Sequence, residues 1–154
     1  MSTKAQTFSL DFFLALTIFL VGFVLLLIFW NYTNSQIQER KSLDELIDAA
    51  FSLSQIWFIE GKPVYWNEQN VKVMGLANEN RINQTKLNFL NDMGYEEVKK
   101  KLNVGYNFYF RLHNNTHELF SFGLSPSPAS AVVKVDRLSI LNSTPVIIEV
   151  IVWG

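Results

Sequence analysis

One uninterrupted apolar run dominates the pattern of hydrophobic and polar positions along this chain. Residues 12–30 read FFLALTIFLVGFVLLLIFW, nineteen positions without a charge, of which fifteen are Leu, Ile, Phe or Val. As an α-helix rising about 1.5 Å per residue, this segment covers roughly 28 Å, which matches a bilayer core. The pattern therefore predicts a membrane-spanning helix, with Trp30 and Tyr32 at the far interface.

A cleaved secretory signal and a buried core helix both fit the run less well. A secretory signal has an apolar stretch of roughly 7 to 15 residues, and no A-x-A cleavage site follows Trp30. A core helix of a soluble protein would present a polar face, which this segment lacks. Asp11, directly before the run, does not prevent insertion. Its cost, at most about 3 kcal/mol, is smaller than the roughly 4 to 9 kcal/mol gained by the apolar side chains.

A second, amphipathic helix is predicted after the polar stretch 31–41. Ser42 and Glu45 have capping-box spacing, and Gly61 marks the end of the pattern. The pattern leaves two arrangements open: a continuation of the apolar helix past a break at Asn31–Ser35, or a separate helix folded back on the domain. The apolar stripe comprises Leu43, Ile47, Ala50, Ser54 and Trp57, widened by Leu46, Leu53 and Phe58.

The middle of the chain predicts a loop followed by two short helices. Residues 61–76 start with turn-forming residues and end in an apolar alternation, which suggests a short edge strand at Val71–Leu76. Asn83 then caps a helix over Gln84–Asp92. A second helix, Tyr95–Leu102, carries Glu96–Lys100 and Glu97–Lys101 pairs at helical spacing.

The last fifty residues change to a period of two, which is typical of strands. Tyr106, Phe108, Phe110 and Leu112 alternate with polar or half-polar residues, and NNT supplies a turn into HELFSF. After a Pro- and Ser-rich break, AVVKVDRLSIL and VIIEVIVW flank a second turn, NSTP. The fold class predicted is α+β: a long amino-terminal helix, short helices and a four-stranded antiparallel sheet. One face of this sheet is expected to be buried under the amphipathic helix.

Charge and cysteine content exclude several classes of function. The chain has 13 Lys and Arg against 14 Asp and Glu, so no net field attracts nucleic acid. Without cysteine it can form no disulfide, thiolate nucleophile or sulfur-ligated metal site. We therefore expect no nucleic-acid partner.

The sequence provides little catalytic chemistry. His113 and His117 have the spacing of a zinc pair on a helix, but the intervening residues predict a turn, which leaves only an approach across a hairpin. No glycine-rich phosphate loop or G-x-S-x-G elbow occurs, and the KKK run at 99–101 is expected to be a solvated helix end. We predict no enzyme and assign no catalytic residue, cofactor or metal ligand. A membrane-tethered hydrolase that uses both histidines is the remaining enzymatic alternative.

Orientation in the membrane is not settled by basic residues, since Lys4 precedes the run while Arg40 and Lys41 follow it. Sequons are a weaker guide and favour an external carboxyl-terminal part. The candidate glycosylation sites are Asn31, Asn83, Asn114 and Asn142, the last with Pro145 just beyond it.

The amino terminus carries a recognisable combination of features. Lys4-Ala5-Gln6, then Ser9-Leu10-Asp11 and the apolar helix, resembles the start of archaeal type IV pilin-like proteins with a class III signal peptide. The resemblance implies cleavage between Ala5 and Gln6 by a prepilin-peptidase-type protease, with the helix retained. The family most often has glycine at the position of Ala5, and glutamate one position nearer the cut than Asp11.

This resemblance implies three parts: a leader at 1–5, a transmembrane or filament-core helix at 6–33, and an extracytoplasmic domain at 34–154. It also implies a role for Asp11. A carboxylate among packed helices needs a partner, because a lone buried charge costs several kcal/mol, and the freed amine of Gln6 on a neighbouring subunit would supply it. The alternative is that Asp11 faces the lipid headgroups.

The expected function is a pilin-like structural subunit that inserts in the membrane and assembles into a pilus or pilus-like surface complex, with minor-subunit status left open. Its partners would be membrane lipid, other pilin subunits bound through the amino-terminal helix, and the processing protease. The rival hypothesis is an external binding or sensing domain held permanently by an uncleaved single-pass helix.

Overall fold

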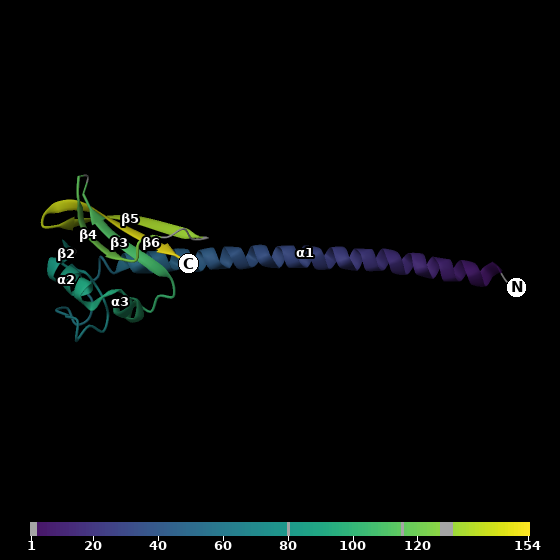
Figure 1. The fold of residues 1–154 in the computed structure, drawn as a ribbon, viewed down its shortest axis with the longest axis horizontal. Coiled ribbons are helices and arrows are strands. Elements are labelled where there is room, and N and C mark those ends of the chain that lie inside the picture. Colours follow the sequence, from purple (N-terminus) through teal and green to yellow (C-terminus); the bar gives the residue numbers. More distant parts are fainter. Residues whose placement is uncertain (1–2, 80, 115, 127–130) are drawn as a thin grey trace. The chain divides into compact units, whose positions relative to one another are not determined.

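In a computed structural model, the structure describes residues 3–79, 81–114, 116–126 and 131–154, with side chains from Leu10 onward. The chain divides into two compact units, Met1–Ser42 and Leu43–Gly154. Helix α1, Thr3–Gln55, contributes residues to both units. The second unit is an α+β domain, as the sequence predicts (Figure 1). Its other elements are β1 (Ala77–Asn78), β2 (Arg81–Ile82), α2 (Gln84–Met93), α3 (Tyr95–Leu102), β3 (Asn107–His113), β4 (Glu118–Gly123), β5 (Val132–Leu141) and β6 (Thr144–Trp153).

Helix α1 continues through the polar stretch, which confirms the predicted continuation of the apolar helix. The expected break at Asn31–Ser35 and the separate folded-back helix are wrong. The polar side chains there bond to their own helix: Thr33 Oγ1, for example, donates to Phe29 O over 2.9 Å. Ser42 is not an N-cap either, because it lies within the helix and its Oγ donates to Glu39 O. Capping-box spacing alone did not start a helix here, since the preceding residues were already helical.

The last turns of α1, with the two residues that follow them, bury most of the predicted stripe, so this prediction is largely confirmed. The buried set is Leu46, Ala50, Leu53, Ser54, Ile56 and Trp57. The predicted stripe placed Leu43 and Phe58 within the apolar face, but both are exposed. The helix also ends at Gln55 rather than near Gly61, because a turn follows in which Phe58 N donates to Gln55 O.

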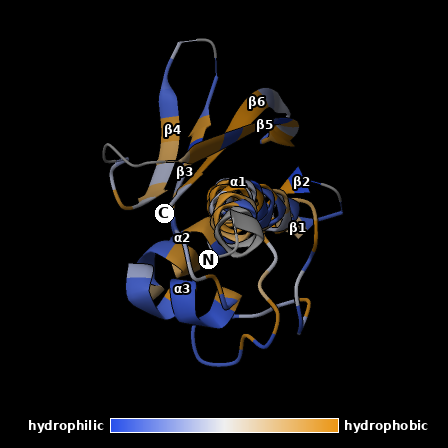
Figure 2. Ribbon diagram, turned by 90° about the vertical axis from the view of Figure 1, so that its right-hand side faces the viewer, coloured by the Kyte–Doolittle hydropathy of each residue, from blue (hydrophilic) through white to orange (hydrophobic). Residues whose placement is uncertain are grey.

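The domain has three layers around these turns of α1. Residues 43–55 lie between the four-stranded sheet and the pair α2 and α3 (Figure 2). The sheet is antiparallel, with strand order β4-β3-β6-β5. Leu46, Ala50 and Leu53 of α1 share one core cluster with the buried residues of the sheet, which confirms that the helix packs against it. Just after the helix, the Trp57 ring meets Phe110 of β3 edge-on, with ring centroids 5.6 Å apart.

The predicted alternation in the strands is confirmed. Phe108, Phe110 and Leu112 of β3 are fully buried, and the residues between them are only partly covered. In β6 the corresponding inward residues are Val146, Ile148, Val150 and Val152. Period-two patterning therefore places one face of the sheet in the core, as a half-buried sheet requires.

The turn between β5 and β6 is tight, with Leu141 paired to Thr144. Its two central residues, Asn142 and Ser143, have φ angles of 49° and 66°. Positive φ at both central positions is the requirement of a two-residue type I′ hairpin, whose twist matches the flanking strands.

The two short helices agree with the sequence prediction. Asn83 caps α2, since its Oδ1 accepts hydrogen bonds from Thr85 N and Lys86 N. In α3 the Glu97–Lys101 pair forms, with Oε1 and Nζ 3.6 Å apart. No ion pair joins Glu96 to Lys100, although both residues are among those described.

The segment between α1 and β1 is held by backbone contacts rather than by an edge strand. The strand expected at Val71–Leu76 is wrong. Residues 71–76, all of which the structure describes, form no strand and contribute a single isolated bridge, between Lys62 and Val73. The backbones of Gly75 and Gly61 are in close contact, because a Cβ on Gly75 would overlap backbone atoms of Gly61 and Ile59. The close contact between Gly61 and Gly75 sets the backbone path of this segment, so its short apolar alternation does not form a strand.

The glycine contact predicts that Gly75→Ala destabilises the domain by at least about 2 kcal/mol, because backbone atoms must move apart to admit the methyl group. The free energy of unfolding would be measured by denaturant titration of the full chain in detergent, with tryptophan fluorescence as the signal. Gly105→Ala is the matched control, since a Cβ there meets nothing within 4 Å. Equal stability of the two variants would contradict the close contact.

Candidate functional site

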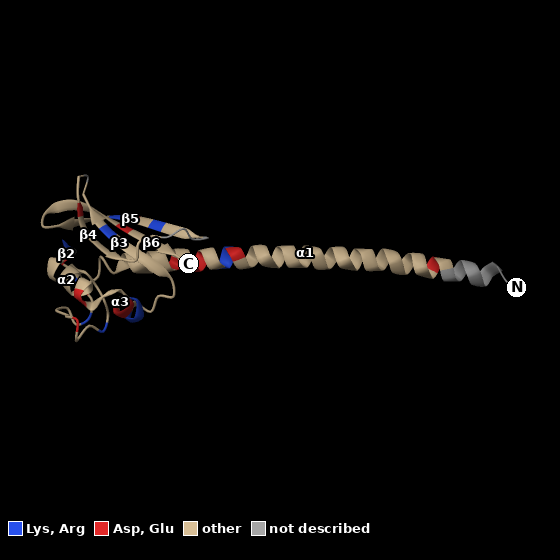
Figure 3. Cartoon of the chain, viewed as in Figure 1, with Lys and Arg blue, Asp and Glu red and all other residues tan. Residues whose placement is uncertain are grey.

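The apolar part of α1 has no partner within its own unit. Every large apolar side chain from Leu10 to Trp30 is at least 40% exposed. No charged residue occurs between Asp11 and Glu39, as Figure 3 shows along the helix. In the part of the chain that the structure describes, α1 is the helix long and apolar enough to cross a membrane. A continuous apolar surface of this kind calls for lipid or other apolar helices around it.

Polar groups on this surface are satisfied by the helix itself. Thr17 is the polar side chain inside the run, and its Oγ1 donates to Phe13 O over 2.8 Å. Just past the run, Asn31 Nδ2 donates to Leu27 O over 3.0 Å. Because these groups already have acceptors, the helix can enter an apolar environment without leaving them unpaired.

Asp11 lies at the amino-terminal edge of this surface and is exposed. Among the residues whose side chains are described, nothing donates a hydrogen bond to it or forms an ion pair with it. Lys4, Ala5 and Gln6 belong to the first turns of α1, but their side chains lie outside the described part of the chain. Cleavage before Gln6 and pairing of Asp11 with a neighbouring amine remain predictions.

The four candidate glycosylation sites lie in different settings. Asn31 is within α1, directly after Trp30, and its amide nitrogen is already bonded. Asn83 and Asn114 both use their Oδ1 atoms to hold turns, whereas Asn142 is exposed in the β5–β6 turn. Glycosylation at each site also remains a prediction.

The two histidines belong to the β3–β4 hairpin. Asn114 N donates to His117 O over 3.0 Å, which closes the turn, and His113 Nδ1 lies 3.2 Å from Asn114 O. They are therefore not on one helix face, where their spacing would suit zinc. Among the described residues, no three His, Cys, Asp or Glu side chains gather in a group that could hold a metal.

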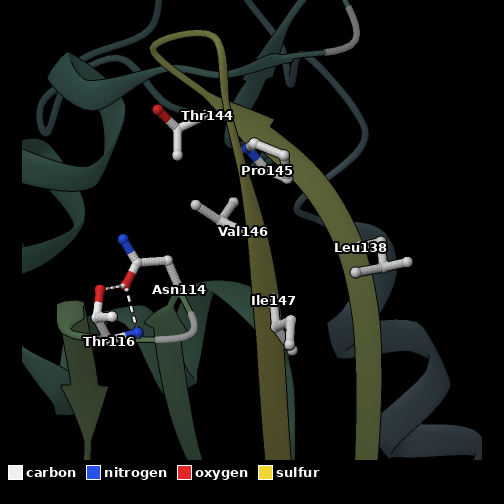
Figure 4. Close-up of a pocket in the computed structure, with 7 residues that line it drawn as sticks. All are labelled: Asn114, Thr116, Leu138, Thr144, Pro145, Val146 and Ile147. Carbon is white, nitrogen blue, oxygen red and sulfur yellow. Dashed lines mark hydrogen bonds between the residues drawn. The ribbon is translucent and has the colours of Figure 1, made fainter.

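A hollow of about 330 Å³ opens beside this hairpin (Figure 4). Thr144, Val146 and Ile147 line it from β6, and Leu138 from β5. Asn114 and Thr116 provide its polar edge, but Asn114 Oδ1 already accepts from Thr116 Oγ1 over 3.0 Å. None of the lining residues titrates near neutral pH, so the hollow contains no acid–base or nucleophilic pair.

A charge cluster that sequence reasoning missed lies across the sheet face away from α1. Glu149 of β6 is buried and stands between Arg111 of β3 and Asp136 of β5 in the strand register. Its Oε2 is 3.0 Å from Arg111 Nη2 and 2.6 Å from Lys134 Nζ. A lone Glu inside VIIEVIVW was the sequence signal, but it identified no partner.

The cluster sets the pKa values of its members. Burial would raise the pKa of the Glu149 carboxyl, but the hydrogen bond from Lys134 and the charges of Lys134 and Arg111 outweigh burial and hold that pKa below its ordinary value. The hydrogen bond to Glu149 in turn raises the pKa of the Lys134 ammonium. The arrangement pairs opposite charges across three neighbouring strands, so a structural role fits it best.

Comparison of the chain with protein-family models, with curated proteins and with solved structures finds no match in any of the three. The structure thus defines a class by architecture: a long apolar amino-terminal helix followed by a small α+β domain. This class is compatible with a single-pass membrane protein.

The charge cluster predicts how stability depends on pH. Because the folded pKa of Glu149 is lowered, its contribution is complete above the unfolded value of about 4.3 and is lost as pH falls through the folded pKa. Because the folded pKa of Lys134 is raised, its contribution to stability is complete below the unfolded value of about 10.4 and is lost as pH rises through the folded pKa. Glu149→Gln should therefore lower the free energy of unfolding at pH 7 by about 1 to 2 kcal/mol.

The same variant should lose less stability than the parent chain on acidification from pH 7. The measurement is denaturant unfolding of the full chain in detergent across this range, with Glu118→Gln as control, because Glu118 is an exposed strand carboxylate outside the described ion pairs. Identical pH profiles for parent and Glu149→Gln would show that the cluster does not contribute as described.

Proposed function

We propose that this chain is a pilin-like structural subunit that is inserted in the membrane by α1, processed before Gln6 and assembled through that helix into a pilus or pilus-like surface complex. One observation carries the proposal: the apolar surface from Leu10 to Trp30 is exposed on all sides, while the same helix ends in the core of a folded domain. A helix that both anchors a domain and presents an unpartnered apolar surface is suited to either lipid or other copies of itself.

The exposed apolar surface of α1 needs an apolar environment both before and after assembly. Before assembly, lipid covers the apolar side chains, because each transferred from water gains free energy in proportion to its area. In a filament, neighbouring helices would replace the lipid. The apolar side chains would then stay shielded from water, and the subunit would no longer need lipid around its helix.

Asp11 supports assembly over a purely anchoring role. An anchor gains nothing from a carboxylate at the start of its apolar run, since the charge opposes deeper insertion. In a helix bundle, however, a carboxylate can pair with the positively charged amine that cleavage before Gln6 would create. Such a pair would fix the axial register between subunits, because breaking it leaves a buried charge unpaired.

The α+β domain provides the part of each subunit that would meet the surroundings. Its core contains none of the apolar residues of the 12–30 run, because the core cluster begins at Leu46. A low copy number, as a minor subunit with a specialised domain, is consistent with this division of roles.

The proposal predicts that Asp11→Asn lowers incorporation into filaments at least tenfold, because the amide cannot form the charge pair. The variant should still accumulate in the membrane fraction at parental levels, because its apolar run is unchanged. The measurement is an immunoblot of sheared filaments against membranes, from cells with class III peptidase and pilus assembly machinery.

Asp44→Asn is the matched control, since Asp44 is an exposed carboxylate on the same helix beyond the apolar run. It should incorporate normally. Parental incorporation of Asp11→Asn would contradict the role of the carboxylate. Absence of even the parent chain from filaments would contradict assembly and favour the permanent anchor.

A further inference from the structure

A cleft of about 340 Å³ lies on the side of the domain formed by the α1–β1 segment and the start of α2. We call it the amide cleft, because it is lined by three asparagines, Asn67, Asn78 and Asn83, together with the aromatic residues Tyr65, Trp66 and Phe89. An adjoining hollow of about 250 Å³ shares Asn67 and Phe89 with it and adds Glu68 and Gln69. The volume of the amide cleft is at the lower end of the range for small-molecule sites, and the adjoining hollow leaves room for a longer ligand.

The aromatic side chains of the cleft differ in exposure. Trp66 is buried and fixed, since its Nε1 donates to Gly75 O over 2.7 Å, and its ring lies 6.1 Å from the ring of Phe89. Tyr65 is 84% exposed, although large aromatic side chains are usually at least half-buried. The cleft therefore has a rigid aromatic base and one exposed ring at its edge.

The amide groups are oriented by the backbone around them. Asn67 Oδ1 accepts from Gln69 N and Asn70 N, at 3.0 and 3.1 Å. Asn83 Oδ1 likewise accepts from Thr85 N and Lys86 N. Because the oxygens are committed to backbone N–H groups, the NH₂ group of each side chain remains as a donor, and none of the described residues accepts from it.

Asn78 adds an acceptor that lacks a donor. Its Oδ1 is buried and accepts no hydrogen bond among the described residues. A buried acceptor left without a donor is unfavourable, so a donor brought within reach by a rotation of this amide would relieve the penalty. The cleft thus combines fixed donors with an unsatisfied acceptor, as a ligand carrying hydroxyl groups requires.

The lysine that lines the cleft already has hydrogen-bond partners within the protein. Lys86 is buried, and its Nζ donates to Glu60 O over 2.6 Å and to Ala77 O over 2.9 Å. Burial lowers the pKa of this ammonium, while the charge of Glu60 opposes that change. Since Lys86 holds two backbone segments together, it is not a free cation that would attract an anionic ligand.

We propose that the amide cleft binds a neutral carbohydrate. A sugar ring has C–H groups on its faces that pack on aromatic rings, with Tyr65 available for this contact. Its hydroxyl groups donate and accept, which matches the amide donors of Asn67 and Asn83 and the acceptor of Asn78. An anionic ligand would find no free cation here, and a purely apolar ligand would leave the NH₂ donors of Asn67 and Asn83 and the acceptor of Asn78 without partners.

The binding test uses the full chain, produced in a host without N-glycosylation, so that a glycan on Asn83 cannot fill the cleft. It is kept in a detergent without a sugar headgroup. The probes are N-acetylchitotriose, maltotriose and mannotriose, with adenosine as an aromatic non-sugar ligand, and saturation-transfer NMR reports binding. At least one trisaccharide should bind saturably, with a Kd on the order of 1 mM or tighter.

Tyr65→Ala should weaken that binding at least tenfold, whereas Tyr65→Phe, which keeps the ring, should remain within about threefold of the parent. Tyr109→Ala is the control on the far face of the sheet, outside the cleft lining, and should leave affinity unchanged. Saturable binding of none of the trisaccharides, binding of adenosine alone, or binding insensitive to Tyr65→Ala would overturn the proposal. Because no filament is involved, these outcomes are independent of the assembly experiment.

Discussion

The burial of one face of the chain from Leu46 to Trp57, which comprises the last turns of α1 and the two residues after them, is the constraint on which the domain depends. Ala50, at the centre of this face, is fully buried, and Trp57 meets Phe110 of the sheet edge-on. The sheet has one face rich in Phe and Val, which would be exposed without the helix. The same turns also separate the sheet from α2 and α3, so a single helix segment completes both halves of the core.

Helix α1 therefore has two environments along one continuous element. Up to Trp30 its apolar side chains are exposed all round, and from Leu46 onward one face of the helix is buried in the domain. The polar residues between them satisfy their own hydrogen bonds and do not interrupt the helix. This change in apolar pattern along α1 is the physical basis for treating the first part as an assembly or membrane surface and the second as part of a folded domain.

Much of the fold was accessible from sequence because local patterns decide it. The cap residue Asn83 and the apolar positions after it predicted α2. The alternation around Phe108 and Phe110 predicted a strand of the sheet. Errors arose where a distant contact decides the local structure. The contact between Gly61 and Gly75 sets the path of a segment that reads as a strand, and a preceding helix overrides the cap signal of Ser42. The Glu149 cluster brings together residues of three strands, and the amide cleft joins a loop to the start of α2, so no periodic pattern marks either of them.

The most direct test of pilin-like processing is the intact mass and amino-terminal sequence of the chain recovered from membranes of cells that contain a class III peptidase. We predict a chain that starts at Gln6 and retains the apolar helix. A chain starting at Met1 or Ser2 would contradict pilin-like processing and favour a permanent anchor. A chain starting beyond Trp30 would mean that the helix is a removed signal, and the apolar surface of α1 would then have no role in the mature protein.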